Sequence, residues 1–357
     1  MLWPLHETLE FIKPHLPGQL ITPQSFSKAK IIANLLGDSM SSYYLECRLG
    51  ADASQVDFLT CATIKGGRTI LAGHHSMADL PAYMLENCLW RRLRNFFIRW
   101  AESGSCLNGQ APLIWLEFDD IARLSHELPL PGLSVCLDAE FLDVYPRVQH
   151  LNRIERQVYQ RIAETVLELL GDDSVSFRAQ QNLQACFDCL PTGGQLIHIS
   201  VMSARQPAVL KLYGSVPRHT LEPYLSHLGW GGSMAELTNM LNTFDYFIGE
   251  NLFIDLTIDN AVSPRLGIAF PYDQIGNLPQ PDRQREMLLN KCVELGLCTP
   301  EKSHALLSWP GKARETFTDQ TWPTRLSRWI DVKIVYQPSF PLEAKGYLGF
   351  MPSFSLL

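Results

Sequence analysis

The chain has 357 residues, of which 46% are hydrophobic and 19% charged, and its formal net charge is −7. This composition is that of a globular protein with a sizeable core. The acidic balance argues against a nucleic-acid-binding protein, which needs a basic face.

Five pairs of alternating strands follow one another along the chain, each joined by a polar or Pro-containing turn. We predict these β-hairpins near residues 43–65, 113–138, 195–214, 252–270 and 331–350. Helical stretches separate the hairpins. A helix–hairpin–helix pattern that recurs five times does not fit a parallel α/β sheet, in which single strands alternate with single helices.

The helices between the hairpins are predicted from their apolar spacing. In the stretch 153–171, Ile154, Val158, Ile162 and Val166 fall on one face at helical spacing. The last helix begins with Thr299 and Pro300, a pair typical of an N-cap and the first helical residue. The full set of predicted helices is 82–101, 153–171, 177–190, 219–229, 234–244, 282–296 and 299–309.

The strands carry one apolar and one polar face, because alternate side chains point to opposite sides. In the third hairpin, for example, Ile197, Ile199 and Val201 alternate with His198 and Ser200. We expect the helices to cover the apolar face and the polar face to line the inside. The predicted fold is α+β: a closed antiparallel barrel of about ten strands, ringed by helices and wide enough to enclose a cavity. Closure also removes exposed sheet edges.

Four cations lie on the predicted inner face: Lys211, Arg265, Lys333 and Lys345. A cluster of cations inside a barrel is costly unless an anion binds there. A diphosphate is a natural ligand, since lysine and arginine neutralise it and tyrosine hydroxyls donate to its oxygens. Two tyrosines lie two residues from a lysine on the same face, Tyr213 and Tyr347. The alternative is that these residues are solvated side chains on an open sheet face.

Glu46 stands out on the first strand, between apolar Leu45 and Cys47. It would face the inside with Tyr44 and Arg48, where it could act as a general base or stabilise a cationic intermediate. The alternative is a salt bridge with Arg48 or a neighbouring cation. The inner-face residues expected to shape an acceptor pocket are Tyr44, Trp115, Glu117 and His198.

No metal site is predicted. Cys186-x-x-Cys189 lacks a second cysteine pair or a histidine pair at zinc spacing. No phosphate-binding glycine loop occurs either. We therefore expect no required cofactor, although Mg²⁺ could accompany a bound diphosphate.

The chain is expected to be a cytoplasmic protein. Prolines and charges interrupt its first residues too early for a signal peptide, and no stretch approaches the ~18 apolar residues of a membrane span. Nine cysteines, an odd number, are spread along the chain, which indicates reduced thiols. No linker or low-complexity tract marks a boundary, so we predict one domain over residues 1–357.

The fivefold repeat resembles the ABBA prenyltransferases, and most closely the cyanobactin peptide prenyltransferases, from about Ser41 to Phe350. The segment YLE at 44–46 resembles the first-strand segment that places the family's catalytic glutamate, which would be Glu46 here. LKLY at 210–213 resembles the return strands that bind diphosphate, and VKIVY and AKGY resemble the C-terminal strands.

This resemblance implies transfer of an isoprenyl group from an isoprenyl diphosphate to an aromatic or peptide side-chain acceptor, as in the biosynthesis of ribosomal peptide (RiPP) natural products. The four cations would hold the diphosphate, while Tyr213 and Tyr347 would shield the carbocation and exclude water. One departure is the return strand of the first hairpin, where only Lys65 could supply a cation. Two alternatives stay open: a non-catalytic barrel that binds a peptide or small hydrophobic ligand, and another lyase or transferase on a similar helix-wrapped sheet.

Overall fold

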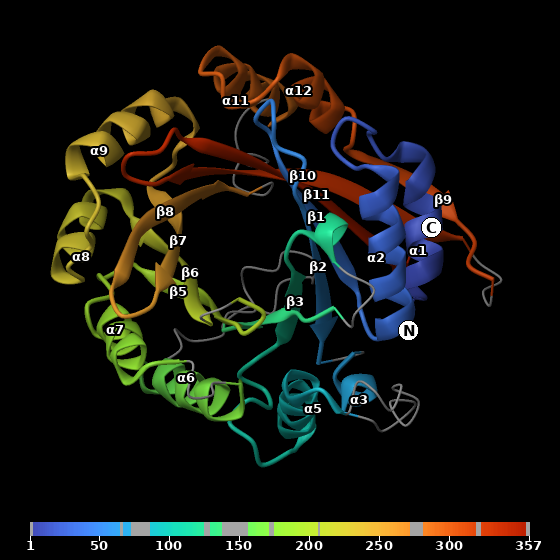
Figure 1. Ribbon diagram of the computed structural model, residues 1–357, viewed down its shortest axis with the longest axis horizontal. Helices are drawn as coiled ribbons and strands as arrows, with labels where there is room; N and C mark the ends of the chain where they lie inside the picture. Colours follow the sequence, from blue (N-terminus) through green and yellow to red (C-terminus); the bar gives the residue numbers. More distant parts are fainter. Residues whose placement is uncertain are drawn as a thin grey trace.

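The structure, a computed structural model, describes residues 3–64, 67–72, 86–124, 129–137, 156–170, 175–205, 208–271, 281–318 and 323–354. Its strands form one antiparallel sheet that curves into a ring, with helices on the outside (Figure 1). None of the helices in the described ranges combines the length and the hydropathy of a membrane-spanning segment.

Ten strands close the ring. Each strand pairs with the next along the barrel, and β11 pairs with β10 on one side and β1 on the other. The strands are β1 (Ser42–Arg48), β2 (Val56–Thr63), β3 (Leu113–Phe118), β4 (Gly132–Cys136), β5 (Gln195–Met202), β6 (Val209–Pro217), β7 (Asn251–Ile258), β8 (Val262–Phe270), β10 (Thr324–Tyr336) and β11 (Glu343–Phe354). The predicted closed antiparallel barrel built from five hairpins is therefore confirmed.

The fifth hairpin is longer than predicted, since β10 and β11 extend beyond 331–350 at their outer ends. The N-terminal half of β10 pairs with an additional short strand, β9 (Gly311–Glu315). The residues of β9 are mostly polar and show no apolar alternation, and none of them is buried. Lys65 and Asp138, the last predicted residues of the first two hairpins, lie outside the described residues.

A helix occupies each predicted helical stretch, and two further helices precede the first strand. Helix α2 (Pro23–Leu36) begins at Thr22, whose hydroxyl accepts a hydrogen bond from the Ser25 N–H, and ends at Gly37 with φ 58°. The remaining helices around the ring are α1 (Leu5–Ile12), α3 (Gly67–Leu71), α5 (Cys88–Ala101), α6 (Arg156–Leu170), α7 (Phe177–Asp188), α8 (Leu221–His227), α9 (Met234–Thr243), α11 (Pro281–Glu294) and α12 (Pro300–Leu307).

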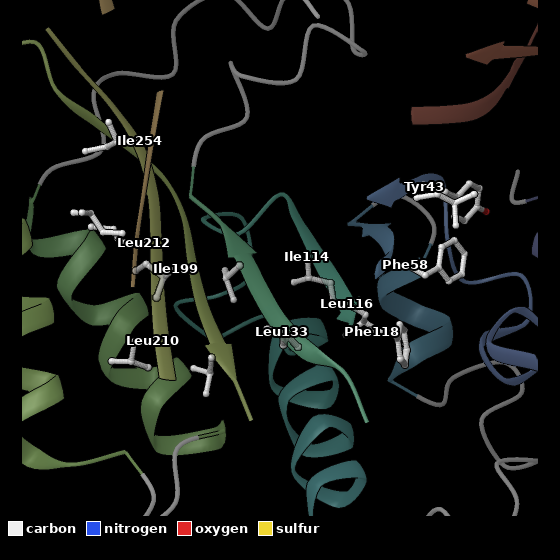
Figure 2. Close-up of a cluster of buried hydrophobic side chains, with 14 of the residues drawn as sticks. Tyr43, Phe58, Ile114, Leu116, Phe118, Leu133, Ile199, Leu210, Leu212 and Ile254 are labelled. Atoms are coloured by element: carbon white, nitrogen blue, oxygen red, sulfur yellow. The ribbon is translucent and has the colours of Figure 1, made fainter. Parts of the chain in front are cut away.

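The main hydrophobic core lies between the strands and the helices. Figure 2 shows outward-facing side chains of neighbouring strands in one layer, among them Tyr43, Phe58, Leu116 and Phe118. These four side chains have no exposed surface. Burial of this apolar layer is the main driving force for wrapping the helices around the barrel.

One predicted strand face is wrong at Ile197. The pairing of β5 with β6 shifts register between Leu196 and His198. As a result Ile197 leaves the outer apolar face and packs in a second, smaller cluster with Cys61, Leu113 and Cys136. Trp115, Tyr213 and Phe253 pack against this cluster, so it belongs to the inner side of the barrel. A bulge of this kind adds one residue to a strand and reorients the neighbouring side chains.

Candidate active site

Glu46 lies on the inner face of β1, with 4% of its surface exposed. Its Oε1 is 2.6 Å from Arg48 and 2.7 Å from Lys345 of β11. Pairing of β1 with β11 sets Glu46 opposite Tyr347, and this register brings Lys345, the one cation of β11, within reach. Closure of the barrel therefore builds the surroundings of Glu46 from the first and last strands of the ring.

Arg48 connects three carboxylates. Its guanidinium lies 2.6 Å from Glu46, 2.9 Å from Asp57 and 2.8 Å from Glu343. Asp57, on β2, also accepts a hydrogen bond of 2.7 Å from the Asp120 backbone N–H. The salt bridge between Glu46 and Arg48, an alternative that the sequence left open, is present together with the contact to Lys345.

The two neighbouring carboxyl groups, Glu46 and Asp57, titrate differently. Burial raises the pKa of Glu46, but the charges of Lys345 and Arg48 outweigh it and hold that pKa well below its usual value. Burial, followed by the charge of Glu46, raises the pKa of Asp57 to about 6. Glu46 is thus a carboxylate at neutral pH, and Asp57 is the group in this pair that gains a proton first as the pH falls.

Each of the four predicted cations pairs with a carboxylate across the inner face. Lys211 lies 3.2 Å from Glu117, and Lys345 pairs with Glu46. Lys333 lies 2.7 Å from Asp255, and Arg265 contacts Glu343 at 3.5 Å. The charges of Lys333 and Lys211 both act on the pKa of Glu46. The structure therefore brings Lys211, Lys333, Lys345 and Glu46 into one electrostatic neighbourhood, and Arg265 is linked to it because its charge acts on the pKa of Lys345.

Arg205, in the turn after β5, extends this network. It forms a two-pronged contact with Asp119, at 2.7 and 2.8 Å, and also reaches Glu117 at 3.2 Å. The ion pairs of the inner face contain equal numbers of positively and negatively charged side chains. The cations are Arg48, Arg205, Lys211, Arg265, Lys333 and Lys345, and the carboxylates are Glu46, Asp57, Glu117, Asp119, Asp255 and Glu343.

Aromatic rings line the same interior. The Tyr44 ring lies 5.5 Å from Trp115, 5.6 Å from Trp329 and 6.0 Å from Tyr347. All four side chains keep part of their surface accessible, in contrast to the sealed rings of the outer layer. The inner-face rings are therefore less completely covered than the rings that pack against the helices.

A second aromatic group stacks on the opposite wall. The Tyr213 ring lies 5.6 Å from His198 and 6.3 Å from Phe253, both nearly parallel to it. Burial, reinforced by the charge of Lys333, lowers the pKa of His198 to about 4. Burial raises the pKa values of Tyr213 and Tyr347 well above the usual value. These three side chains are therefore neutral at pH 7.

Several members of the interior were not singled out from the sequence as site residues. Asp57, Asp255 and Trp329 occupy positions that strand alternation assigns to the inner face, so periodicity could have found them. Glu343 begins β11 and shares the face of Lys345, but it lies one residue before the predicted return strand. Arg205 lies in a turn, where no such signal exists. Within the described ranges, no group of three or more His, Cys, Asp or Glu side chains is placed to hold a metal ion.

Sequence comparison yields no relative: no protein-family model matches the chain, and no curated protein does. Solved structures do match in shape. PriB, in a binary complex with product diphosphate, matches with a TM-score of 0.52 at 13% identity, over 100% of both chains. NotF, in complex with brevianamide F and DMSPP, matches with a TM-score of 0.56 at 11% identity, over 98% of this chain and 93% of that chain.

A third structure, described as 6-dimethylallyl tryptophan synthase, has a TM-score of 0.51 at 13% identity, over 96% of this chain and 94% of that chain. Likenesses at such low identity establish a common architecture, whereas function depends on the site itself. The ring of hairpins, the outer helices and these structural matches together show that the chain has the αββα-barrel fold of the ABBA prenyltransferases.

Proposed function

We propose that the protein is a prenyltransferase that moves an isoprenyl group from an isoprenyl diphosphate to an aromatic or peptide side-chain acceptor. The observation that carries the proposal is the gathering of Lys211, Arg265, Lys333 and Lys345, from four strands, on the inner face with Glu46. Neighbours of the same fold hold product diphosphate in PriB, and DMSPP with brevianamide F in NotF.

The proposed donor site consists of the four cations. In the reaction the bond between the allylic carbon and the diphosphate oxygen breaks, and the diphosphate leaves with the electron pair. Lys211, Lys333, Lys345 and Arg265 would neutralise the charge that develops on it. Tests with and without Mg²⁺ decide whether the ion assists this step.

The proposed acceptor side of the reaction uses the aromatic interior. The acceptor forms a new bond to the allylic carbon and releases a proton, which we assign to Glu46. Because nearby cations lower the Glu46 pKa, its carboxylate stabilises a cationic intermediate well but is a weak base until Lys345 turns toward the diphosphate. Tyr44, Trp115, Glu117 and His198 are the proposed acceptor-pocket residues.

Tyr213 and Tyr347 are the proposed shield of the carbocation. The ammonium of Lys333 lies 5.4 Å from the centre of the Tyr347 ring, a position in which a π face attracts positive charge. This contact supports the assignment, because the same face could receive an allylic cation. The flat rings would also limit the access of water to that cation.

We further propose that the protein acts in the cytoplasm, in peptide natural-product biosynthesis. None of the nine cysteines, all of which lie within the described residues, forms a disulfide, and this supports a reducing compartment. An assay with amino acids, cyclic dipeptides and ribosomal peptides as acceptors distinguishes the peptide setting from a small-molecule one.

Calorimetric titration with dimethylallyl and geranyl diphosphate tests the donor site. We expect micromolar binding that Lys211→Ala weakens by about tenfold or more, since a charge-assisted contact is lost. Lys312→Ala, an exposed lysine of β9 outside the ring, is the matched control and should bind like the wild type. Failure of every isoprenyl diphosphate to bind would contradict the proposal.

One observation favours a second candidate, a barrel that binds its ligand without catalysis. The inner-face positions of β2 and β4 carry no cation, and the interior cations are already paired with carboxylates. Binding of aromatic or peptide ligands together with a complete lack of diphosphate binding would support this candidate over the enzyme.

A further inference from the structure

Lys333 reaches its carboxylate partner across an intervening strand. Lys333 belongs to β10, Asp255 to β7, and β8 lies between them. A side chain at Gly267 of β8 would approach both Asp255 and Lys333 to 3.1 Å, so the missing side chain leaves room for the 2.7 Å ion pair. The sequence thus provides a specific place for an ammonium group beside Asp255.

The surroundings of this ammonium are those of a cation-binding site. Asp255 supplies the negative charge, and the Tyr347 ring faces Lys333 at 5.4 Å. Tyr213 is the strand neighbour of Asp255 on β6 and is stacked with Phe253. A carboxylate flanked by aromatic rings is the arrangement that recognises amines and guanidinium groups.

Diphosphate binding would affect the interior carboxylates unequally, if the donor site is as proposed above. Glu46 and Glu343 would still contact Arg48 after losing Lys345 and Arg265. Glu117 would still contact Arg205. Asp255 differs, because Lys333 is its one ion-pair partner in the part of the chain that the structure describes.

Asp255 cannot remain unpaired at low cost, since only 10% of its side chain is exposed. A buried carboxylate without a partner is strongly unfavourable. The charges of Lys211 and Arg265 also act on Asp255, but both residues belong to the proposed donor site and would be neutralised by the same diphosphate. Movement of Lys333 toward that diphosphate therefore favours a new positive charge at Asp255, either from another cation or from a proton. The aromatic walls favour an organic cation, because they offer π faces rather than further oxygen ligands.

We infer that the acceptor carries an amine or guanidinium group that replaces the Lys333 ammonium at Asp255 when the donor binds. This inference rests on the proposed function and specifies its acceptor class. Asp255 becomes a specificity-determining residue. Donor and acceptor bind cooperatively, because the donor draws Lys333 away from Asp255 and the acceptor cation replaces its charge there.

The experiment is calorimetric titration of the full chain with inorganic diphosphate in EDTA, without and with saturating tryptamine. Tryptophol, which replaces the ammonium of tryptamine by a neutral hydroxyl, is the matched ligand. We expect tryptamine to tighten diphosphate binding by about tenfold, and tryptophol to leave it unchanged. Asp255→Asn should bind diphosphate alone more tightly than the wild type and show no effect of tryptamine.

Asp119→Asn is the control variant, because Asp119 pairs with Arg205 and not with a proposed donor cation; it should retain the tryptamine effect. Three results would each overturn the inference. The first is an equal effect of tryptophol on diphosphate binding, and the second is a tryptamine effect that persists in Asp255→Asn. The third is proton uptake on diphosphate binding together with a diphosphate affinity that tryptamine does not change. If neither inorganic nor dimethylallyl diphosphate binds to the wild type or the variant, the proposed function itself is contradicted.

Discussion

The two faces of the same ten strands differ in what stabilises them. On the outer face, side chains such as Phe118 and Phe350 are sealed from solvent against the helices. On the inner face lie ion pairs and partly accessible rings such as Trp115 and Tyr44. The difference indicates that apolar burial on the outer face maintains the fold, whereas the inner face keeps charged and aromatic side chains in a less completely covered environment.

The largest effect is expected from Glu46→Gln. This change keeps the shape of the side chain but removes the charge that pairs with Arg48 and Lys345. Turnover should fall by about 10²–10⁴-fold, as expected for loss of an acid–base group. Diphosphate binding should persist or strengthen, since Lys345 no longer has a competing carboxylate. Single-turnover kinetics and calorimetry check both parts, and full activity in the variant would remove Glu46 from the mechanism.

The next effect compares two residues of β3 with opposite orientations. Phe118→Ala should lower the free energy of unfolding by about 3–5 kcal/mol, because it leaves a cavity in the sealed layer. Trp115→Ala should cost only roughly 1–2 kcal/mol, since that ring is partly accessible, yet it should weaken acceptor binding. Urea denaturation of both variants measures the difference. Equal destabilisation would show that the inner face is as tightly packed as the outer one.

A smaller effect should follow from the raised pKa of Asp57, about 6. Between the ordinary aspartate pKa and this value, the folded state binds more protons than the unfolded state, so the free energy of unfolding falls as the pH rises. Between pH 5 and 7 the wild type should lose about 1 kcal/mol relative to Asp57→Asn. Urea denaturation at both pH values tests this, and parallel pH profiles of the two proteins would contradict it.

The smallest effect concerns a charge on the outer side. The Arg328 guanidinium lies 5.3 Å from the Trp309 ring centre, and two of its nitrogens are buried without a hydrogen-bond partner among the described residues. Arg328→Met retains the packing and removes the desolvated charge. The free energy of unfolding should be unchanged or rise by up to about 1 kcal/mol. A clear loss of stability in urea would reveal a role for this charge.

The prediction of the fold from the sequence depended mainly on the alternation of apolar and polar residues, which is visible among neighbouring residues of one strand. It placed the hairpins and the inward cations, but it failed at Ile197, where a bulge shifts the register. It also overlooked α1 and α2, although Thr22 and Pro23 form a recognisable helix start. The mostly polar residues of β9 offered no apolar periodicity from which to predict a strand.

The site was less predictable than the fold because ion pairing depends on register between distant strands. Glu46 and Lys345 are 299 positions apart in the sequence, and Lys333 meets Asp255 only because Gly267 leaves room. The sequence suggested which residues face inward. It could not indicate that each predicted cation has a carboxylate partner, since those contacts follow from barrel closure.

Pairing of β1 with β11 makes closure of the barrel dependent on contacts between segments about 300 residues apart in the sequence. Until β11 is available, β1 and β10 are open edges that can pair with another chain. Such distant contacts also slow folding, because a very long loop must close before they form. The ion pair between Glu46 and Lys345 joins the two strands of this pairing, so it forms only when β1 and β11 meet.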